Sequence, residues 1–303
     1  MCPLRAAVAD ESCDAAPGSR LIAGVVLDHA GAMLADAQPD QRPALWDQHV
    51  ALYEIVFEPF SLALAASAIE ALALQPAEAV LDVGAGNGGA ALALARRGCR
   101  VTAIDASSGM IARLRARAEA AALDVEAQVM DGQALTFADA AFDAALSVFG
   151  VILCPDAVRG LAEMRRVVRR GGRVAVVTWT EPQHYELAAE LRAAVLAVKP
   201  DQPASPLPAQ LRFRERADLT ALFSAAGFDA VDIETRRAEL HAPSARWLGA
   251  RLGFAPGMAA QLDNLGDAAP AVIERFVANL ETRQGEGAIR LGGVAFVAAA
   301  TVR

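Results

Sequence analysis

The sequence has one lysine and four cysteines, and each scarcity argues against a class of protein. Lys199 is the only lysine, the formal net charge is −8, and the arginines are mixed with acids. A strongly basic face for DNA or RNA is therefore not expected. The cysteines, Cys2, Cys13, Cys99 and Cys154, lack metal-site spacing. We therefore expect reduced thiols in a cytoplasmic protein, and no metal.

The chain also lacks long apolar runs and the pattern of a secretion signal. No stretch of about 18 uninterrupted apolar residues occurs, which argues against a transmembrane helix. The N-terminus does not show a basic segment followed by an apolar one. With 303 residues, 54% of them hydrophobic, the chain can still bury a large core as one domain.

One glycine-dense turn organises the rest of the sequence. The apolar run 80–83 leads into Gly84-Ala85-Gly86-Asn87-Gly88, and an alanine-rich segment follows without a break. This order predicts a strand, a tight loop and a helix. Glycines let a ligand approach the backbone closely, and a helix start offers unpaired N–H groups. The pattern favours a loop that binds a nucleotide cofactor over a purely structural turn.

The loop by itself leaves the identity of the cofactor open. Its glycines, with Asp105 about twenty residues further on, fit the dinucleotide fingerprint, and they fit a G-x-G-x-G pattern equally well. Asp82 lies two residues before the first glycine. A carboxylate there would repel a pyrophosphate and would suit a ligand with a positive amino group. S-adenosylmethionine carries such a group.

At these residues the sequence resembles the class I S-adenosylmethionine-dependent methyltransferases. Within them it is similar to the small-molecule branch that includes the enzymes of ubiquinone and menaquinone biosynthesis. The resemblance covers residues 41–235 well and the remainder weakly. It implies a Rossmann-like α/β fold with a doubly wound, mostly parallel seven-stranded sheet. It also implies an N-terminal helical lid and a helical insertion near the C-terminus.

Strand and helix patterns alternate after the loop, which implies a parallel sheet with right-handed crossovers. We expect helices at 89–97, 107–119, 155–170, 185–198 and 215–226, and strands at 100–105, 124–130, 142–150, 173–180, 231–235 and 294–302. Gly171 and Gly172 are expected to end the third of these helices. The last two strands are expected to pair antiparallel, with a helical insertion at 239–284 between them.

The chain divides into four stretches. Residues 1–20 are expected to be a disordered tail, and 21–75 a helical lid with helices at 43–58 and 60–74. Residues 76–180 are the predicted cofactor-binding core, and 181–303 hold the cap over the substrate and the last strands. Trp46 and Tyr53 share one face of the lid. A core role is favoured for Trp46 and stays open for Tyr53, whose hydroxyl needs a partner.

The strand ends supply the candidate cofactor ligands. We expect Asp82 to hold the amino group directly or through water, and Asp105 to accept from the ribose hydroxyls. The resemblance implies that Asp131 accepts from the adenine amino group and that Met110 packs on the ring. The competing interpretations are a helix start for Asp105, a turn for Asp131 and a core position for Met110. The predicted set is Tyr53, Asp82, Gly84, Ala85, Gly86, Asn87, Gly88, Asp105, Ala106, Met110, Asp131, Gly132, Gln133, Ala134, Ser147 and Phe149.

Methyl transfer from a sulfonium is an in-line displacement, so the protein mainly supplies alignment and desolvation. A base is needed only if the acceptor loses a proton. Members of the resembled family usually carry Asn, Asp or His at the end of the fourth strand. Here the stretch 147–150 occupies that position and supplies no strong proton acceptor. His184 and Glu181, after the fifth strand, are the candidate bases, although a lone histidine is more often structural.

The expected function is methyl transfer to a small apolar or aromatic metabolite with an O, N or C nucleophile, with S-adenosylhomocysteine as product. Three alternatives stay open: cyclisation of S-adenosylmethionine, an NAD(P)-dependent oxidoreductase, and a cofactor-binding subunit without activity of its own. The sequence identifies neither the acceptor nor the methylated atom. Homodimers are common among such folds, but no feature of the sequence requires one.

Overall fold

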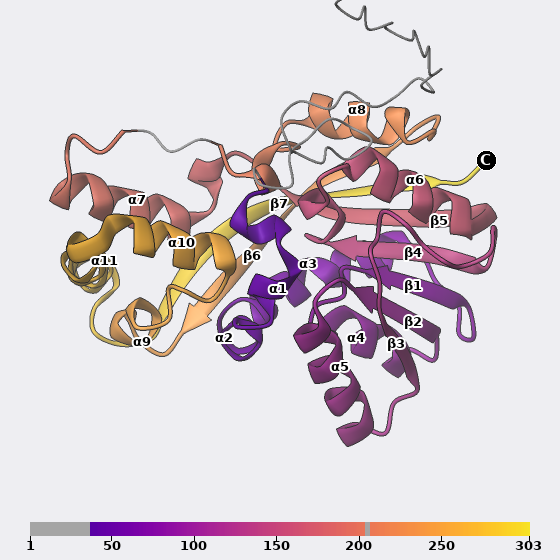
Figure 1. The fold of residues 1–303 in the computed structure, drawn as a ribbon, viewed down its shortest axis with the longest axis horizontal. Helices are drawn as coiled ribbons and strands as arrows, with labels where there is room; N and C mark the ends of the chain where they lie inside the picture. The colour runs from indigo at the N-terminus through magenta and orange to yellow at the C-terminus, as the bar shows by residue number, and fades with distance from the viewer. Residues whose placement is uncertain (1–36, 204–206) are drawn as a thin grey trace, which may run out of the picture. The chain divides into compact units, whose positions relative to one another are not determined.

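A seven-stranded sheet is the centre of the fold in the computed structural model, which describes residues 37–203 and 207–303 (Figure 1). The strands are β1 (Ala79–Val83), β2 (Arg100–Asp105), β3 (Val125–Val129), β4 (Phe142–Val148), β5 (Val168–Trp179), β6 (Asp232–Ala242) and β7 (Ile289–Thr301). Their order is β3-β2-β1-β4-β5-β7-β6. The first five run parallel, and β7 pairs antiparallel with β5 and β6. This confirms the predicted doubly wound, mostly parallel sheet.

Helices cover both faces of the sheet. They are α1 (Pro43–Trp46), α2 (Val50–Val56), α3 (Glu58–Ala71), α4 (Gly89–Arg96), α5 (Ser108–Ala120), α6 (Ala157–Val167), α7 (Glu186–Val198), α8 (Arg216–Ala225), α9 (Ala245–Gly249), α10 (Pro256–Leu265) and α11 (Ala269–Gln284). Helix α3 packs on β4 to β7 and on α4, whereas α6 and α8 pack together on the opposite face (Figure 1). The central strands are buried on both faces, as the apolar runs of β1 and β4 require.

The expected tail at 1–20 and the beginning of the lid at 21–36 lie outside the described residues. In the described part of the lid, the predicted helix at 43–58 is wrong, because it is broken after Trp46. The break frees two side chains for distant partners. Asp47 accepts from the backbone N–H of Gly109 at 2.8 Å, and His49 Nδ1 lies 2.8 Å from the carbonyl oxygen of Gly253. Helix α3 begins at Glu58, with Pro59 in its first turn, where no N–H is needed.

The prediction that Gly171 and Gly172 end a helix is also wrong. Helix α6 ends at Val167, and β5 begins at Val168. The register between β4 and β5 shifts between Phe142 and Ala144, and Gly171 has a φ of +80°. The glycine pair therefore forms a bulge inside β5 rather than a helix end.

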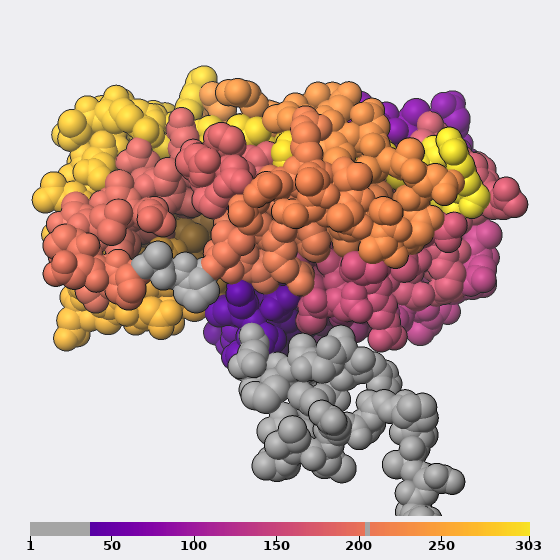
Figure 2. Space-filling model, turned by 90° about the horizontal axis from the view of Figure 1, so that it is seen from above, coloured from indigo at the N-terminus to yellow at the C-terminus, as the bar shows by residue number. Residues whose placement is uncertain are grey.

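The last two strands are longer than predicted, so the insertion between them is shorter. Strands β6 and β7 pair with each other from Asp232 to Ala242 and from Ile289 to Ala299. The polar side chains of β6 alternate with less exposed ones, a pattern that an antiparallel edge tolerates. Helices α9, α10 and α11 follow β6 and confirm a helical insertion before β7. Figure 2 shows the α11 region in yellow beside the salmon α7, with which it packs.

No single helix within the described ranges is long and apolar enough to cross a membrane. The pair α2 and α3 reaches that length and composition only together, across a bend of 67°.

Candidate functional site

The glycine loop leaves the carboxyl end of β1 and turns directly into α4. Gly84, Gly86 and Gly88 adopt positive φ values of 70°, 55° and 91°, which favour glycine. A Cβ at Gly84 would lie 2.7 Å from Cα of Gly150. The loop therefore touches the chain that leaves β4, at the edge where such sheets bind ligands.

Two buried polar atoms, one in β1 and one in this loop, have no hydrogen-bond partner among the described residues. They are Asp82 Oδ2 and Asn87 Nδ2, on side chains that are each 1% exposed. Both residues line one cavity of about 20 Å³, together with Tyr53 and Glu58. A buried polar group without a hydrogen bond costs about 1–3 kcal/mol. By their chemistry, a carboxylate acceptor and an amide donor suit the ammonium and carboxylate groups of an amino-acid moiety, although the cavity itself has room for about one water molecule.

The electrostatics of Asp82 favour a cation. Burial, and secondarily the nearby carboxylate of Asp105, raise the pKa of Asp82 to about 7. The burial penalty falls on the charged form of the carboxyl group, and an adjacent positive charge would offset it. A ligand with an ammonium group at this position therefore stabilises ionised Asp82.

Asp105 ends β2 and joins two parts of the site. Its Oδ2 accepts from the N–H of Gly86 at 2.8 Å, and its Oδ1 accepts from the N–H of Ser107 at 2.8 Å. Ser107 caps α5 by accepting from the N–H of Met110 at 3.1 Å. The cap of α5 is thus Ser107, which leaves Asp105 half-buried beside the loop. Met110 is buried in the first turn of α5.

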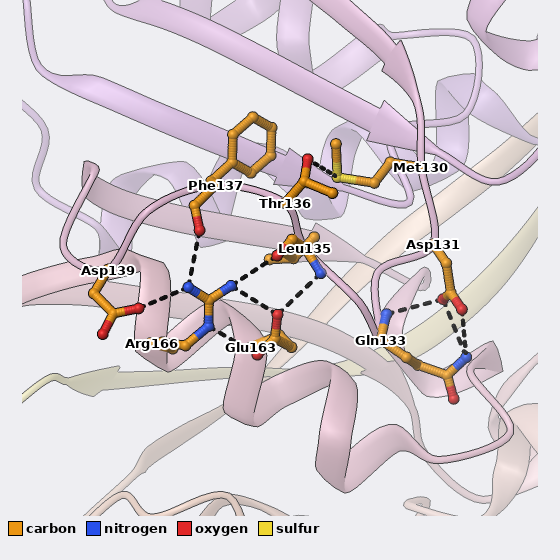
Figure 3. Close-up of polar contacts among 9 residues, drawn as sticks. All are labelled: Met130, Asp131, Gln133, Leu135, Thr136, Phe137, Asp139, Glu163 and Arg166. Carbon is orange, nitrogen blue, oxygen red and sulfur yellow. Dashed lines mark hydrogen bonds and ion pairs between the residues drawn. The ribbon is translucent and has the colours of Figure 1, made fainter.

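Asp131 follows β3, and its carboxylate points toward Gln133 (Figure 3). Its Oδ1 accepts from the backbone N–H of Gln133 at 2.9 Å and from Nε2 of the same residue at 3.1 Å. The N–H of Ala134 donates to the carbonyl oxygen of Asp131 at 3.0 Å. The segment therefore forms a hydrogen-bonded turn. The backbone N–H groups of Gln133 and Ala134, which were expected to contact the adenine ring, donate to Asp131 within this turn. Asp131 is exposed, so its carboxylate stays accessible from solvent.

Arg166 of α6 fixes the segment that follows this turn. Its guanidinium donates to the carbonyl oxygens of Leu135 and Phe137, each at 2.8 Å, and pairs with Glu163 at 2.8 Å (Figure 3). In return, Glu163 accepts from the N–H of Leu135 at 2.9 Å. The loop between β3 and β4 is thereby tied to α6, which steadies the position of Asp131.

Hydrogen bonds of a buried serine fix the end of β4. Ser147 is fully buried, donates to the carbonyl oxygen of Val83 at 2.7 Å and accepts from the N–H of Val151 at 2.8 Å. Its hydroxyl thus joins the ends of β1 and β4. Phe149 has a φ of +56°, which is a costly conformation for a bulky residue.

Aromatic rings gather at this edge of the sheet. We define the aromatic cluster as Tyr53, Phe57, Phe60, Phe149, Trp179, Tyr185 and Phe254, whose neighbouring ring centroids lie 4.5–6.0 Å apart. Trp46 of the lid adjoins this cluster, edge-on to Tyr53 at 5.7 Å. The rings come from the lid, the ends of β4 and β5, the segment before α7 and the insertion. A Cβ at Gly86 would lie 3.8 Å from Tyr53 Cε1. One end of the aromatic cluster therefore touches the glycine loop.

Sequence reasoning placed only Tyr53 and Phe149 of the aromatic cluster at the site. Trp179 ends β5. Because ligands bind at the carboxyl ends of such strands, the sequence position of Trp179 could have indicated a place at the site. Phe254 lies in the insertion, and no local pattern in the sequence connects it with the lid.

Ion pairs hold the lid against α5. Glu54 of α2 pairs with Arg113 at 2.6 Å, and Glu58 of α3 pairs with Arg117 at 2.7 Å. Arg117 also donates to the carbonyl oxygen of Asn87 at 2.8 Å. The second pair thus links the lid, α5 and the glycine loop.

The two candidate bases already have protein partners. Glu181 pairs with Arg214 at 3.3 Å. His184 is exposed, and its Nδ1 lies 3.3 Å from Oγ1 of Thr180. Their assignment as bases stays a prediction. Within residues 37–203 and 207–303, His, Cys, Asp and Glu side chains form no group of three or more that would hold a metal ion.

Comparisons with known proteins agree with this geometry. Residues 80–172 match the family described as Methyltransferase domain. The uncharacterised protein Rv1403c of Mycobacterium tuberculosis is 32% identical over 189 residues, which span 62% of this chain and 66%, just under two thirds, of that relative. Demethylmenaquinone methyltransferase of Beutenbergia cavernae is 34% identical over 151 residues, 48% of this chain and 61% of that protein.

Solved structures share the fold. The YcgJ protein of Bacillus subtilis superposes with a TM-score of 0.52 at 20% identity, covering 80% of this chain and 98% of that one. Residues 80–172 thus match a methyltransferase domain in sequence, and the strand order agrees with the fold shared with the YcgJ protein.

Proposed function

We propose that the protein transfers a methyl group from S-adenosylmethionine to a small apolar or aromatic metabolite. The observation that carries this proposal is a pair of unpartnered, buried polar atoms beside the glycine loop. There Asp82 Oδ2 and Asn87 Nδ2, both buried, find no partner in the described part of the chain. When bound, S-adenosylmethionine supplies a methyl group on a sulfonium that is already activated for in-line displacement.

The chain's own residues bind and orient the cofactor. Asp82 accepts from the ammonium group and Asn87 donates to the carboxylate. Glycines 84, 86 and 88 let the backbone approach the methionine portion. Asp105, already placed by Gly86 and Ser107, accepts from the ribose hydroxyls. Asp131 takes the adenine amino group through its remaining lone pairs.

The aromatic cluster suits the acceptor better than a charged ligand would. Its rings are uncharged and largely buried, so they exclude water from the reacting groups and favour flat apolar molecules. Such an environment increases the reactivity of an O, N or C nucleophile that is already electron-rich. His184 or Glu181 removes a proton only where the acceptor must lose one.

Calorimetric titration with S-adenosylhomocysteine tests the cofactor assignment. The wild type should bind at micromolar concentration or tighter. Asp105→Asn removes a charged acceptor, so affinity should fall about 10- to 100-fold. Asp124→Asn, at an exposed acid before β3, is the matched control and should bind like the wild type. Absence of wild-type binding, with tight binding of NADH, would contradict the proposal.

Product analysis separates methyl transfer from cyclisation. The protein is incubated with S-adenosylmethionine, with and without a mixture of aromatic acceptors. Acceptor-dependent formation of S-adenosylhomocysteine supports methyl transfer. Acceptor-independent release of 5′-methylthioadenosine would instead indicate cyclisation.

A further inference from the structure

Tyr185 carries a buried hydroxyl for which the described residues provide no hydrogen-bond partner. Its ring packs 4.6 Å from that of Trp179 and 5.6 Å from that of Phe60, and its backbone bridges to Gly293 of β7. Tyrosines usually find a partner for a buried hydroxyl. A phenylalanine would pack equally well here without the cost of an unmade hydrogen bond, about 1–3 kcal/mol.

The position of Tyr185 suggests what its hydroxyl is for. The chain has two tyrosines, and both belong to the aromatic cluster. Tyr53 lies at the glycine loop, and ring contacts continue through Phe57 and Trp179 to Tyr185. Tyr53 therefore marks the cofactor end of the aromatic cluster, and Tyr185 the end that lies furthest along this series of contacts.

The hydroxyl of Tyr185 is a donor in the pH range of most enzymes. Burial raises the pKa of its phenol above the ordinary value of 10.0, so the proton stays on the oxygen. The group that would pair with it is an oxygen atom with a free lone pair. The surrounding aromatic rings favour an oxygen that belongs to a flat, apolar molecule.

We propose that Tyr185 determines acceptor specificity by donating a hydrogen bond to an oxygen substituent of an aromatic acceptor. This inference rests on the proposed function and narrows its acceptor to oxygenated aromatic compounds, as opposed to hydrocarbons. A site built to hydrogen-bond a substrate oxygen discriminates strongly against the analogue that lacks it, because the buried protein group is then left unpaired.

Equilibrium dialysis of 2-naphthol and naphthalene against the protein saturated with S-adenosylhomocysteine tests this. The wild type should bind 2-naphthol at least about tenfold more tightly than naphthalene. A merely apolar pocket would favour naphthalene, the more hydrophobic probe. Tyr185→Phe should abolish the preference while leaving the calorimetric affinity for S-adenosylhomocysteine unchanged. Tyr53→Phe, at the cofactor end, should keep the preference for 2-naphthol.

Three results overturn the inference while leaving the cofactor assignment intact. The first is a wild type that binds S-adenosylhomocysteine but neither probe. The second is an unchanged preference for 2-naphthol in Tyr185→Phe. The third is a marked fall in the melting temperature of Tyr185→Phe without ligand, which would show that the hydroxyl has a partner within the protein. If the wild type fails to bind S-adenosylhomocysteine, the proposed function itself fails.

Discussion

Replacing Asp82 by asparagine is expected to stabilise the free protein at alkaline pH. The carboxyl group has an ordinary pKa of 3.8, and burial raises the pKa to about 7 in the folded state. The folded state therefore binds the proton more tightly than the unfolded state. The resulting stabilisation is complete below pH 3.8, declines as pH rises, and is lost above about pH 7. The free energy involved is at most about 4 kcal/mol.

Asparagine keeps the shape of the side chain but has no proton to lose. The two proteins should therefore have similar stability near pH 4, and the variant should be more stable at pH 8. Each kcal/mol corresponds to about 2–4 °C in melting temperature for a chain of this size. Scanning calorimetry without ligand at several pH values measures the difference.

Although Asp82→Asn should stabilise the free protein, it should weaken cofactor binding. The ammonium group of S-adenosylhomocysteine requires ionised Asp82, so binding by the wild type must release the proton below pH 7. Affinity should then fall about tenfold for each pH unit below the pKa, or about 100-fold between pH 7 and pH 5. Asp82→Asn should bind about 10- to 100-fold more weakly at pH 8, with no such slope.

A calorimetric pH series with S-adenosylhomocysteine, from pH 5 to pH 8.5, provides the measurement. Asp124→Asn serves as the control and should retain the slope of the wild type. The reasoning is refuted if wild-type affinity does not depend on pH, or if Asp82→Asn retains the same slope. It is also refuted if the free variant melts below the wild type at pH 8.

Two further substitutions test the loop and the lid by thermal denaturation. Gly84→Ala combines positive φ with a clash against Gly150 and should cost about 3 kcal/mol or more. Gly266→Ala has an unfavourable backbone conformation, with φ +53° and ψ −130°, but nothing within 4 Å, so it should cost less, about 1–2 kcal/mol. Equal losses would contradict the clash. Arg117→Gln leaves Glu58, whose side chain is 9% exposed, without its ion pair and should cost about 3 kcal/mol. A loss below about 0.5 kcal/mol would show that the pair does not hold the lid.

The sequence was sufficient for the parallel core because local signals agree there. The glycines after β1, the apolar runs and the acid at the end of β2 all indicate the same strand-loop-helix order. The boundaries failed where tertiary contacts override local preference. Gly171 and Gly172 have the chemistry of a helix end, yet the pairing of β5 with β4 makes them a bulge. The length of β6 depends on its partner β7, which lies more than forty residues further along the chain.

The residues proposed to bind the acceptor were much harder to predict from the sequence. The aromatic cluster combines lid, core and insertion residues whose contacts span about 200 positions, as the stacking of Phe57 on Phe254 illustrates. Each residue alone is typical of a hydrophobic core. The ion pair between Glu58 and Arg117 likewise joins elements that no periodicity connects. Only the folded arrangement shows that these residues come together and that one end of the aromatic cluster touches the glycine loop.

Unsatisfied polar groups distinguish this edge of the sheet from the rest of the described structure. Across residues 37–203 and 207–303, the buried side-chain atoms without a partner are Asp82 Oδ2, Asn87 Nδ2, Thr178 Oγ1 and the hydroxyl of Tyr185. All four belong to β1, β5 or the segment directly after one of them. At about 1–3 kcal/mol each, their cost is large against the roughly 5–15 kcal/mol that stabilises a typical domain. On the proposed function, cofactor and acceptor supply the partners that Asp82, Asn87 and Tyr185 need. Binding should therefore stabilise the fold most strongly when both ligands are present.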